Sequence, residues 1–441
     1  MSEQYYVVQV GLSTAVLTWY GIIWSIGLLG CWTARTRYRS PRSPSFPSTL
    51  PSSTPGVSIL RPLKGLDINL SENLESSFKQ DYPSFEILFS IADEEDEALP
   101  VVRELISEYP NVNARVIIGD EEVGANPKVN NLMRSYNEAT YDILWVLDSN
   151  VSVAPGTLTR AVAMLIGPSA SQAIPPQRRI ALVHHVPFAI SNEASFGTQV
   201  EEAFLNTNHA KMYIAINAVA VDSCVMGKSN LFRRSDLERL DGTLVRQQHH
   251  ESKNSRRGRG LAAFGRFIAE DQMIGLALWH ELDLRHGLSC DVAYNALGAM
   301  NLSDYIRRRI RWIRVRKHMI LLATLLEPFT ESVMLGAITA TSLRFLTGIS
   351  FWMFLPAHFL LWTLVDLDVY ASLAGHPLPR VKWQSFLVAW VVRELLAFPI
   401  WLLAMVGNEV EWRGRRYRVL RNGEGERVLP KASVDRLLAL L

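Results

Sequence analysis

The sequence has few cysteines and little excess charge. Its 441 residues include three cysteines, Cys31, Cys224 and Cys290, which lie far apart and match no metal-ligand spacing. An odd and sparse set of cysteines argues against a disulfide framework and favours a reducing compartment. The formal net charge at pH 7 is only +2. The sequence therefore argues against a chain-wide electrostatic attraction to nucleic acid.

Two further patterns are missing from the sequence. It contains no internal repeat at the period of a solenoid. No G-x-G-x-x-G motif follows the first expected strand at 57–65, which argues against a soluble dehydrogenase-type nucleotide fold. Hydrophobic residues make up 48% of the chain, and their uneven distribution is the informative feature.

The N-terminal stretch at 5–34 contains no charged residue and is long enough to cross a bilayer as a helix, which takes roughly 20 apolar residues. A cleavable signal peptide has a shorter apolar core and a basic start, whereas this chain begins MSEQ. Arginines cluster at 35–42, so the positive-inside rule places the N-terminus outside and the following chain in the cytosol. Residues 1–34 are predicted to be a retained signal anchor.

Two more apolar stretches lie near the C-terminus. Residues 332–365 carry a single formal charge, and residues 384–406 carry an adjacent arginine–glutamate pair. The first stretch is too long for one ordinary span and is predicted to form two short crossings or a hairpin, with Pro356 as a break. The region 319–410 is therefore expected to hold a membrane-interface helix and two or three transmembrane helices. A basic tail is expected at 411–441.

The middle of the chain has the pattern of an α/β domain. Residues 40–55 are rich in serine and proline, so the segment 35–56 is predicted to be a flexible linker. After it, short β-rich runs alternate with helical patterns, which favours a mostly parallel sheet covered on both faces. In such sheets, ligands bind beyond the carboxyl ends of the strands. The expected strands lie within 57–65, 85–93, 114–120, 141–150 and 180–188.

Acidic residues stand where such strands and helices end or begin. Asp93 ends one expected strand, and Asp148 ends another within the sequence DSN. Asp271 follows Glu270 at the start of an apolar helical run, where a carboxylate can also serve only as a helix cap. The DSN sequence resembles the DxD arrangement that holds a divalent cation against a nucleotide diphosphate, with Asn150 in place of the second Asp.

These residues together resemble the ceramide glucosyltransferase family, which are inverting GT-A-type glycosyltransferases related to the cellulose and hyaluronan synthases. The segments 124–133 and 208–234 are similar to family segments as well, whereas the polar stretches 168–179 and 247–260 depart from them and are interpreted as surface insertions. The family's D, D, D, (Q/R)xxRW series is matched in order by Asp93, Asp148, Asp271, Arg308, Arg311 and Trp312.

The resemblance implies a fold, an activity and a location. The fold would be a GT-A (Rossmann-like) nucleotide-sugar-binding domain at 57–318, with an N-terminal transmembrane anchor and a C-terminal transmembrane helical region. The activity would be transfer of glucose from UDP-glucose to the primary hydroxyl of ceramide with inversion, giving glucosylceramide. The protein would lie in the Golgi or ER membrane with its catalytic domain facing the cytosol.

The resemblance also implies which residues bind the donor. Asp93 is expected to contact the uridine, and Asp148 to bind the diphosphate through a Mg²⁺ or Mn²⁺ ion. Lys128, in the segment NPKVNN, is expected to lie against the nucleotide, with an ordinary exposed lysine as the alternative. Asp271 is expected to be the general base, because inversion needs a positioned group that takes the proton of the acceptor hydroxyl.

The basic stretch RRRIRWIRVRK at 307–317 is predicted to have two roles. Arg308 and Arg311 are three apart on a helix, and they are expected to stabilise the charge on the departing UDP. Trp312 is expected to stack on the sugar or to wall the acceptor channel. The later basic residues precede an apolar segment and are expected to meet anionic lipid headgroups. They are Arg314, Arg316 and Lys317.

His209 matches a histidine in the family's acceptor region, and Cys224 is a second candidate there, although both residue types are often structural. Two rival functions are considered. A processive polysaccharide synthase would need a translocation channel and usually has Gln where Arg308 stands. A non-catalytic, lipid-binding membrane protein would leave the ordered acids without a purpose.

Overall fold

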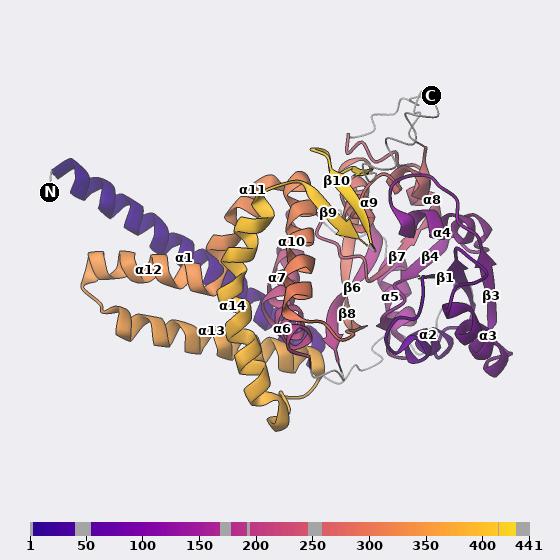
Figure 1. The fold of residues 1–441 in the computed structure, drawn as a ribbon, viewed down its shortest axis with the longest axis horizontal. Helices are drawn as coiled ribbons and strands as arrows, with labels where there is room; N and C mark the ends of the chain where they lie inside the picture. The colour runs from indigo at the N-terminus through magenta and orange to yellow at the C-terminus, as the bar shows by residue number, and fades with distance from the viewer. Residues whose placement is uncertain are drawn as a thin grey trace.

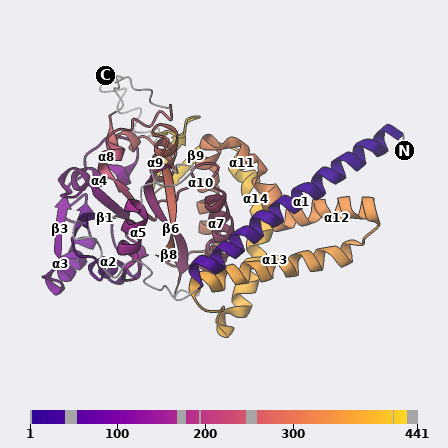
Figure 2. The same ribbon diagram turned by 180° about the vertical axis from the view of Figure 1, so that it is seen from behind.

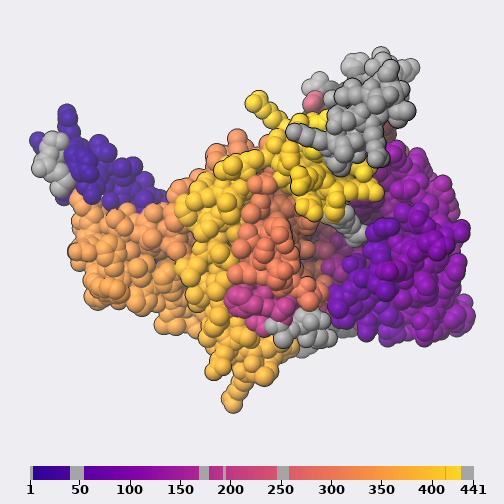
Figure 3. Space-filling model, viewed as in Figure 1, coloured from indigo at the N-terminus to yellow at the C-terminus, as the bar shows by residue number. Residues whose placement is uncertain are grey.

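The computed structural model describes residues 3–39, 54–167, 178–191, 195–245, 258–412 and 414–428. Most of the expected linker and most of both polar insertions, at 168–179 and 247–260, lie outside the described residues. The molecule is elongated, with an α/β domain at one end and a group of long helices at the other (Figure 3).

An eight-stranded sheet forms the centre of the α/β domain, in the order β3-β2-β1-β4-β7-β6-β8-β5 (Figure 1). Strands β3, β2, β1 and β4 are parallel neighbours, and β7 runs antiparallel between β4 and β6. The α/β class predicted from the sequence is therefore confirmed. The strands are β1 (Val57–Leu63), β2 (Phe85–Ile91), β3 (Asn113–Ile118), β4 (Ile143–Leu147), β5 (Val151–Ser152), β6 (Ile180–Ile190), β7 (Ser229–Arg233) and β8 (Arg285–Ala296).

Helices cover both faces of this sheet, so every residue of β1 and of the apolar strand β4 is buried. Adjacent residues of β1 show the alternation: Ile59 packs with one group of helices and Leu60 with the other. The first face carries α2 (Leu70–Phe78), α3 (Ala98–Glu108) and α5 (Thr157–Ile166). The second carries α4 (Pro127–Glu138), α8 (Arg234–Leu237), the 3₁₀ turn η3 (Gly260–Phe264) and α9 (Glu270–His280).

A second set of helices lies between the sheet and the long apolar helices. Helix α6 (Phe196–Phe204) continues through one π-helical turn, η2 (Leu205–His209), into α7 (Ala210–Val219). Helix α10 (Leu302–Met319) begins with a capping box, in which Asn301 and Asp304 bond to each other's backbone amides. Single π-helical turns inside α-helices are frequent at functional sites.

Three helices are long and apolar enough to cross a membrane: α1 (Glu3–Tyr38), α13 (Phe351–Ala374), and α14 (Trp383–Met405) with the 3₁₀ turn η5 (Arg380–Lys382) that precedes it. A fourth candidate is a pair bent by 67°, formed by α11 (Leu321–Leu326) with η4 (Glu327–Thr330) and by α12 (Ser332–Thr347). Helices α1, α12 and α13 lie side by side in both ribbon views (Figures 1 and 2). The chain is therefore a membrane protein with an N-terminal and a C-terminal apolar helical region.

The break within the first C-terminal apolar stretch differs from the prediction. Pro356 lies inside α13, and the chain turns instead at 348–350. Gly348 has a φ of 77°, a left-handed conformation that glycine adopts readily and that ends α12. The proline was the stronger sequence signal, but the glycine sets the turn.

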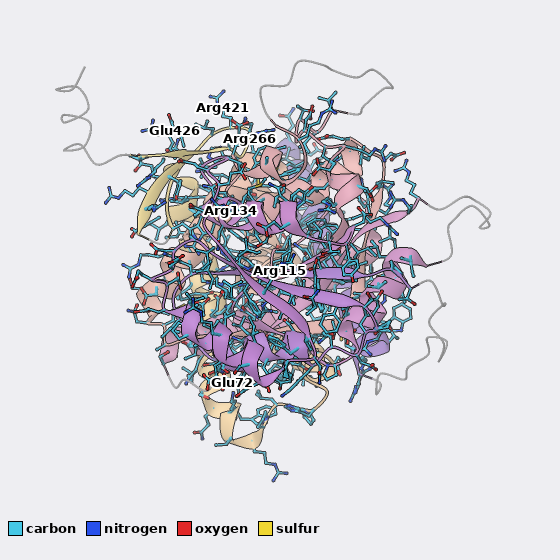
Figure 4. The ribbon with its side chains drawn as sticks, turned by 90° about the vertical axis from the view of Figure 1, so that its right-hand side faces the viewer. Glu72, Arg115, Arg134, Arg266, Arg421 and Glu426 are labelled. Carbon is cyan, nitrogen blue, oxygen red and sulfur yellow. The ribbon has the colours of Figure 1, made fainter. Side chains whose placement is uncertain are left out.

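The C-terminal region contains a small sheet that the sequence analysis did not anticipate. Its antiparallel strands are β9 (Glu409–Trp412), β10 (Arg415–Val419) and β11 (Gly425–Arg427). Tyr417 is 1% exposed and packs with Val315 of α10, and Arg266 forms an ion pair with Glu424 at 3.0 Å. Arg266 lies beside Arg421 and Glu426 in Figure 4. The small sheet thus rests on α10 and on the segment that leads into α9.

Two later basic residues of the 307–317 stretch contact a helix end. Arg314 donates to the carbonyl oxygens of Leu403 and Val406 at 3.2 and 2.9 Å. Lys317 donates to the carbonyl of Met405 at 3.1 Å. The last carbonyls of a helix lack intrahelical donors, and cations stabilise that end of the helix dipole. Arg314 and Lys317 thus cap α14 and fix it to α10, while the contacts with lipid headgroups stay a prediction.

Candidate active site

Beyond the carboxyl end of β4, the residue that follows this strand meets three segments that are far apart in the sequence. Asp148 follows β4 directly, and α4 and α9 begin beside it. The segment 226–228, just before β7, completes the group, because Asp148 N–H donates to the Lys228 carbonyl at 3.2 Å. The edge of the sheet at which the sequence analysis expected the chemistry is therefore the one at which these residues converge.

Asp148 lies between two lysines. The Nζ atom of Lys128 is 2.8 Å from Asp148 Oδ1, and the Nζ atom of Lys228 is 3.0 Å from Oδ2. Burial alone would raise the pKa of Asp148, but the two ammonium groups lower it to about 2. Asp148 is consequently ionised at physiological pH.

Lys128 is shared with a second carboxylate. Its Nζ lies 3.0 Å from Glu270 Oε1 and donates to the Gly227 carbonyl at 3.2 Å. Burial favours the neutral amine, but Asp148 and Glu270 outweigh it and raise the pKa of Lys128 above its usual value. Lys128 is therefore a permanent positive charge in the site, whereas the alternative interpretation of an exposed surface lysine is wrong.

Asn126 joins the beginnings of α4 and α9. Its Oδ1 accepts from the backbone N–H groups of Lys128 and Val129 at 2.9 and 3.2 Å, which caps α4. Its Nδ2 donates to the Phe267 carbonyl at 2.8 Å and to Glu270 Oε2 at 2.7 Å. One amide thus fixes the position of Glu270 and the orientation of the helix that carries Asp271.

Asp271 packs against the backbone of the 226–228 segment. A Cβ atom added to Gly227 would come within 2.7 Å of Asp271 Oδ2, so only glycine fits there without displacing the carboxylate. Burial first, and then the neighbouring Glu270 carboxylate, raise the pKa of Asp271 to about 7, while the Lys128 charge opposes them. Because both lysines bond to other carboxylates, Asp271 can exchange a proton near neutral pH.

Asp93 and Arg311 are held in other surroundings. Asp93 follows β2, is exposed, and accepts from the Glu95 N–H at 3.0 Å. Arg311 donates to the Glu411 carbonyl of β9 at 3.2 Å. The predicted contacts of both residues with the donor remain predictions.

Arg308 faces the sheet side of α10. Its Nε lies 2.8 Å from Glu201 Oε1, whose side chain is fully buried, and its guanidinium lies 4.9 Å from the ring centre of Trp312. Arg309, the next residue, is also buried and lies 3.7 Å from the ring centre of Phe204. The guanidinium groups of Arg308 and Arg309 therefore lie over aromatic rings on the side of α10 that faces α6 and η2.

His209 and Trp312 belong to one aromatic cluster. The His209 ring is 5.8 Å from Tyr213 at 14° and 6.4 Å from Trp312. Burial first, and then the charge of Arg309, lower the pKa of His209 to about 3, so its ring is neutral. The Tyr213 hydroxyl accepts from the Met226 N–H at 3.1 Å. The cluster is thus connected to the segment that packs against Asp271.

Cys224 lies two residues before Met226 and is partly buried. Burial is the main factor that raises the pKa of its thiol to about 11, so the thiol is protonated at neutral pH. A protonated thiol is a poor nucleophile, and a place for Cys224 in the acceptor region stays a prediction.

Comparison with known proteins identifies the family. A family model described as glycosyl transferase family 21 matches residues 19–246 and 255–425. The chain belongs to glycosyl transferase family 21. Two relatives are the ceramide glucosyltransferase of Komagataella phaffii, 38% identical over 92% of this chain and 90% of that protein, and that of Candida albicans, 34% identical over 83% and 87%.

The predicted resemblance is thereby confirmed, and this family 21 protein is a glycosyltransferase enzyme with a GT-A-type α/β domain. A solved structure, a mannosyltransferase from Pyrobaculum calidifontis in complex with GDP-mannose and Mn²⁺, is 17% identical over 88% of this chain and 99% of that one, with a TM-score of 0.42.

The expected divalent cation does not fit the observed arrangement of the family 21 site. Asp148 offers both of its oxygens to lysines, and Asn150 Oδ1 accepts from Lys228 Nζ at 2.9 Å. Within the described residues, no group of three or more His, Cys, Asp or Glu side chains is arranged to hold a metal ion. The oxygens that DSN would give to a cation are therefore bonded to ammonium groups.

Sequence reasoning missed Lys228, Asn126 and the contacts of Glu270. Lys228 lies in VMGKSN, within a segment that was noted only for its likeness to the family. Its position directly before β7, which pairs with β4, was the available signal. Glu270 was noted only as the neighbour of Asp271, and the structure turns its carboxylate towards Lys128 and Asn126.

Proposed function

We propose that the chain transfers glucose from UDP-glucose to the primary hydroxyl of ceramide with inversion, giving glucosylceramide. Relatives named ceramide glucosyltransferase in Komagataella phaffii, Candida albicans and Pyricularia oryzae support the two substrates, and the last is 31% identical over 93% of both chains. The observation that carries the proposal is the Asp271 carboxylate, which has a raised pKa and lies against Gly227 beside charged lysines.

In the proposed reaction, Asp271 is the general base. The acceptor hydroxyl oxygen attacks the anomeric carbon while the bond from that carbon to the diphosphate oxygen breaks, and the hydroxyl proton passes to Asp271. A carboxylate with a pKa near the working pH is suited to this transfer. The lysines beside Asp148 would stabilise the negative charge that grows on the departing UDP.

The remaining donor and acceptor roles follow the family pattern. Asp93, exposed after β2, would contact the uridine, and Arg311 the departing diphosphate. Trp312 and His209 would line the acceptor channel together with Cys224, because their cluster lies between the α9 site and the apolar helices. The Mg²⁺ or Mn²⁺ ion expected at Asp148 is given no role here, since lysines hold both carboxylate oxygens.

The membrane location fits a lipid acceptor. Helix α7 packs along α1, and α6 packs against α14, so the acceptor cluster adjoins two candidate spans. Ceramide is confined to the bilayer, and UDP-glucose is soluble, which favours a site at the cytosolic surface. Arginines at 35–42 lie in the last turn of α1 and directly after it in the sequence, and they support a cytosolic α/β domain. Because ceramide is confined to the bilayer and the site is placed at its cytosolic surface, we place the protein in the Golgi or ER membrane.

The test is sugar transfer by full-length protein in detergent from radiolabelled UDP-glucose to a short-chain ceramide. We expect a lipid product from the parent protein and a loss of rate of roughly 10²-fold or more for Asp271→Asn. A labelled polymer would indicate a processive synthase instead. Equal rates for parent and variant would contradict the assignment of Asp271 and would favour a non-catalytic role for the acids.

A further inference from the structure

Lys228 lies where the DSN sequence would hold a cation. Its Nζ is 3.0 Å from Asp148 Oδ2 and 2.9 Å from Asn150 Oδ1, so a single ammonium group bridges the first and third residues of the motif. The side chain is 14% exposed, which keeps it beneath the surface while its charge still faces the site. A cation between a carboxylate and an amide oxygen is the arrangement that the DxD pattern provides for a metal ion.

The orientation of Asn150 is fixed by its other contacts. Its Nδ2 donates to Asn295 Oδ1 at 3.0 Å and to the Ala296 carbonyl at 3.1 Å. With its amide nitrogen engaged by the last two residues of β8, the Oδ1 atom must face Lys228. The amide oxygen is therefore placed to accept from a cationic donor. With Asn in place of the second Asp, the DSN motif carries one negative charge, which matches the single positive charge of an ammonium group.

Other positive charges surround the same carboxylate. Lys128 binds the second oxygen of Asp148 at 2.8 Å. Arg61 of β1 is fully buried and donates through both terminal nitrogens to the Val151 carbonyl at 3.1 Å. A divalent ion entering between Asp148 and Asn150 would meet the two lysines at close range, and the neighbouring Glu270 carboxylate is already paired with Lys128. A nucleoside diphosphate, which is an anion, would be attracted by the same lysines.

We infer that the Lys228 ammonium group, and not a divalent cation, faces the diphosphate of the donor in this chain. The inference rests on the proposed nucleotide-sugar donor and adds to it a specific binding residue. Lysine is a compact point charge that binds phosphate oxygens directly. As the bond to the anomeric carbon breaks, Lys228 and Lys128 would stabilise the leaving diphosphate from the two sides of Asp148.

The first measurement is calorimetric binding of UDP to full-length protein in detergent, with either EDTA or excess Mg²⁺ in the buffer. We expect dissociation constants that agree within about threefold in the two buffers. Lys228→Ala should weaken UDP binding in EDTA by roughly tenfold or more, because a hydrogen bond to a charged group is lost. Lys79→Ala is the matched control, since Lys79 is an exposed lysine paired with Glu75 on α2.

A second variant separates charge from folding. Lys228→Gln keeps a hydrogen-bond donor without the charge, and its melting temperature should stay close to that of the parent while UDP binding weakens. Recovery of binding by Lys228→Ala on addition of Mg²⁺ would also support the inference, because a metal ion could then occupy the vacated position.

Several outcomes would overturn the inference. Binding of UDP by the parent only when Mg²⁺ is present would show that the lysine gives way to a metal ion, and the proposed function would stand. Equal UDP affinities for the parent and a folded Lys228→Gln protein would show that the Lys228 charge does not face the diphosphate, and the proposed function would again stand. Absence of UDP binding by the parent in both buffers would instead overturn the proposed donor, and the inference with it.

Discussion

Lys211 of α7 forms a buried ion pair with Asp366 of α13, with 2.7 Å between Nζ and Oδ1 and each side chain 1% exposed. The Trp390 indole of α14 donates to the other Asp366 oxygen at 2.9 Å, and the Lys211 ammonium lies 4.1 Å from the ring centre of Trp362. The pair therefore joins the helix that continues from the acceptor cluster to two candidate membrane spans.

Asp366→Asn should destabilise the protein strongly. It leaves the Lys211 charge buried without a carboxylate, which typically costs about 3–5 kcal/mol. The measurement is the thermal midpoint in detergent, compared with Glu409→Gln, which removes an ion pair to Arg418 whose side chains are about half exposed. Replacing both partners, as Lys211→Met with Asp366→Leu, should recover much of the loss. A small effect of Asp366→Asn alone would contradict the importance of this pair.

The position of the site could be predicted from the sequence, but its contacts could not. Asp148 ends a continuous apolar strand, so the rule for parallel sheets placed it at the ligand edge. Its bond to Lys128 depends on where α4 begins, and its bond to Lys228 depends on a segment some eighty residues further along the chain. No local sequence pattern indicates either contact.

The C-terminal region shows a second limit of sequence patterns. Strands β9 to β11 are three to five residues long and rich in charge, so no apolar alternation marks them. The basic residues Arg314 and Lys317 were interpreted from their proximity to an apolar segment, whereas a helix end that lies nearly ninety residues away in the chain provides their acceptors.

Gly227→Ala should lower the catalytic rate more than the stability. The added Cβ would lie 2.7 Å from Asp271 Oδ2 and 3.1 Å from its Cβ, so the carboxylate must move. Because misplacement of a reacting group by about 1 Å can cost roughly 10²-fold, we expect a loss of that order in kcat. Gly298→Ala is the control, since its Cβ would meet only Ile68 at 3.9 Å. Similar rates for both variants would show that Asp271 is not held against Gly227.

The pH dependence of the rate should report Asp271. Burial and Glu270 raise its pKa to about 7, and Lys128 opposes them, so the base is protonated below that pH and the rate should rise through it. Glu270→Gln removes the negative neighbour, stabilises the Asp271 carboxylate and should shift the acidic limb of kcat/KM to lower pH. Asp148, the Gln272 N–H, Tyr213 and Cys224 also lie near Asp271.

Lys128→Met should shift the acidic limb of kcat/KM in the opposite direction. It removes the positive charge that stabilises the ionised base, so the acidic limb should shift to higher pH, in addition to any loss of donor binding. Profiles of kcat/KM over neutral pH for the parent and both variants are the measurement. Shifts of Glu270→Gln and Lys128→Met in the same direction would show that another group controls the limb.

Arg308 and Arg311 should respond differently to truncation, although they belong to one motif. Arg308→Ala leaves the fully buried Glu201 without its ion pair and should lower the thermal midpoint as well as the rate. Arg311→Ala removes a hydrogen bond to the exposed Glu411 backbone carbonyl, among its contacts, and should lower the midpoint less than Arg308→Ala does. A combined Arg308→Met and Glu201→Leu variant removes both buried charges and should restore the midpoint. If its rate stays low, Arg308 acts on the reaction itself. If the rate returns with the midpoint, Arg308 serves only to neutralise Glu201 and to position α10.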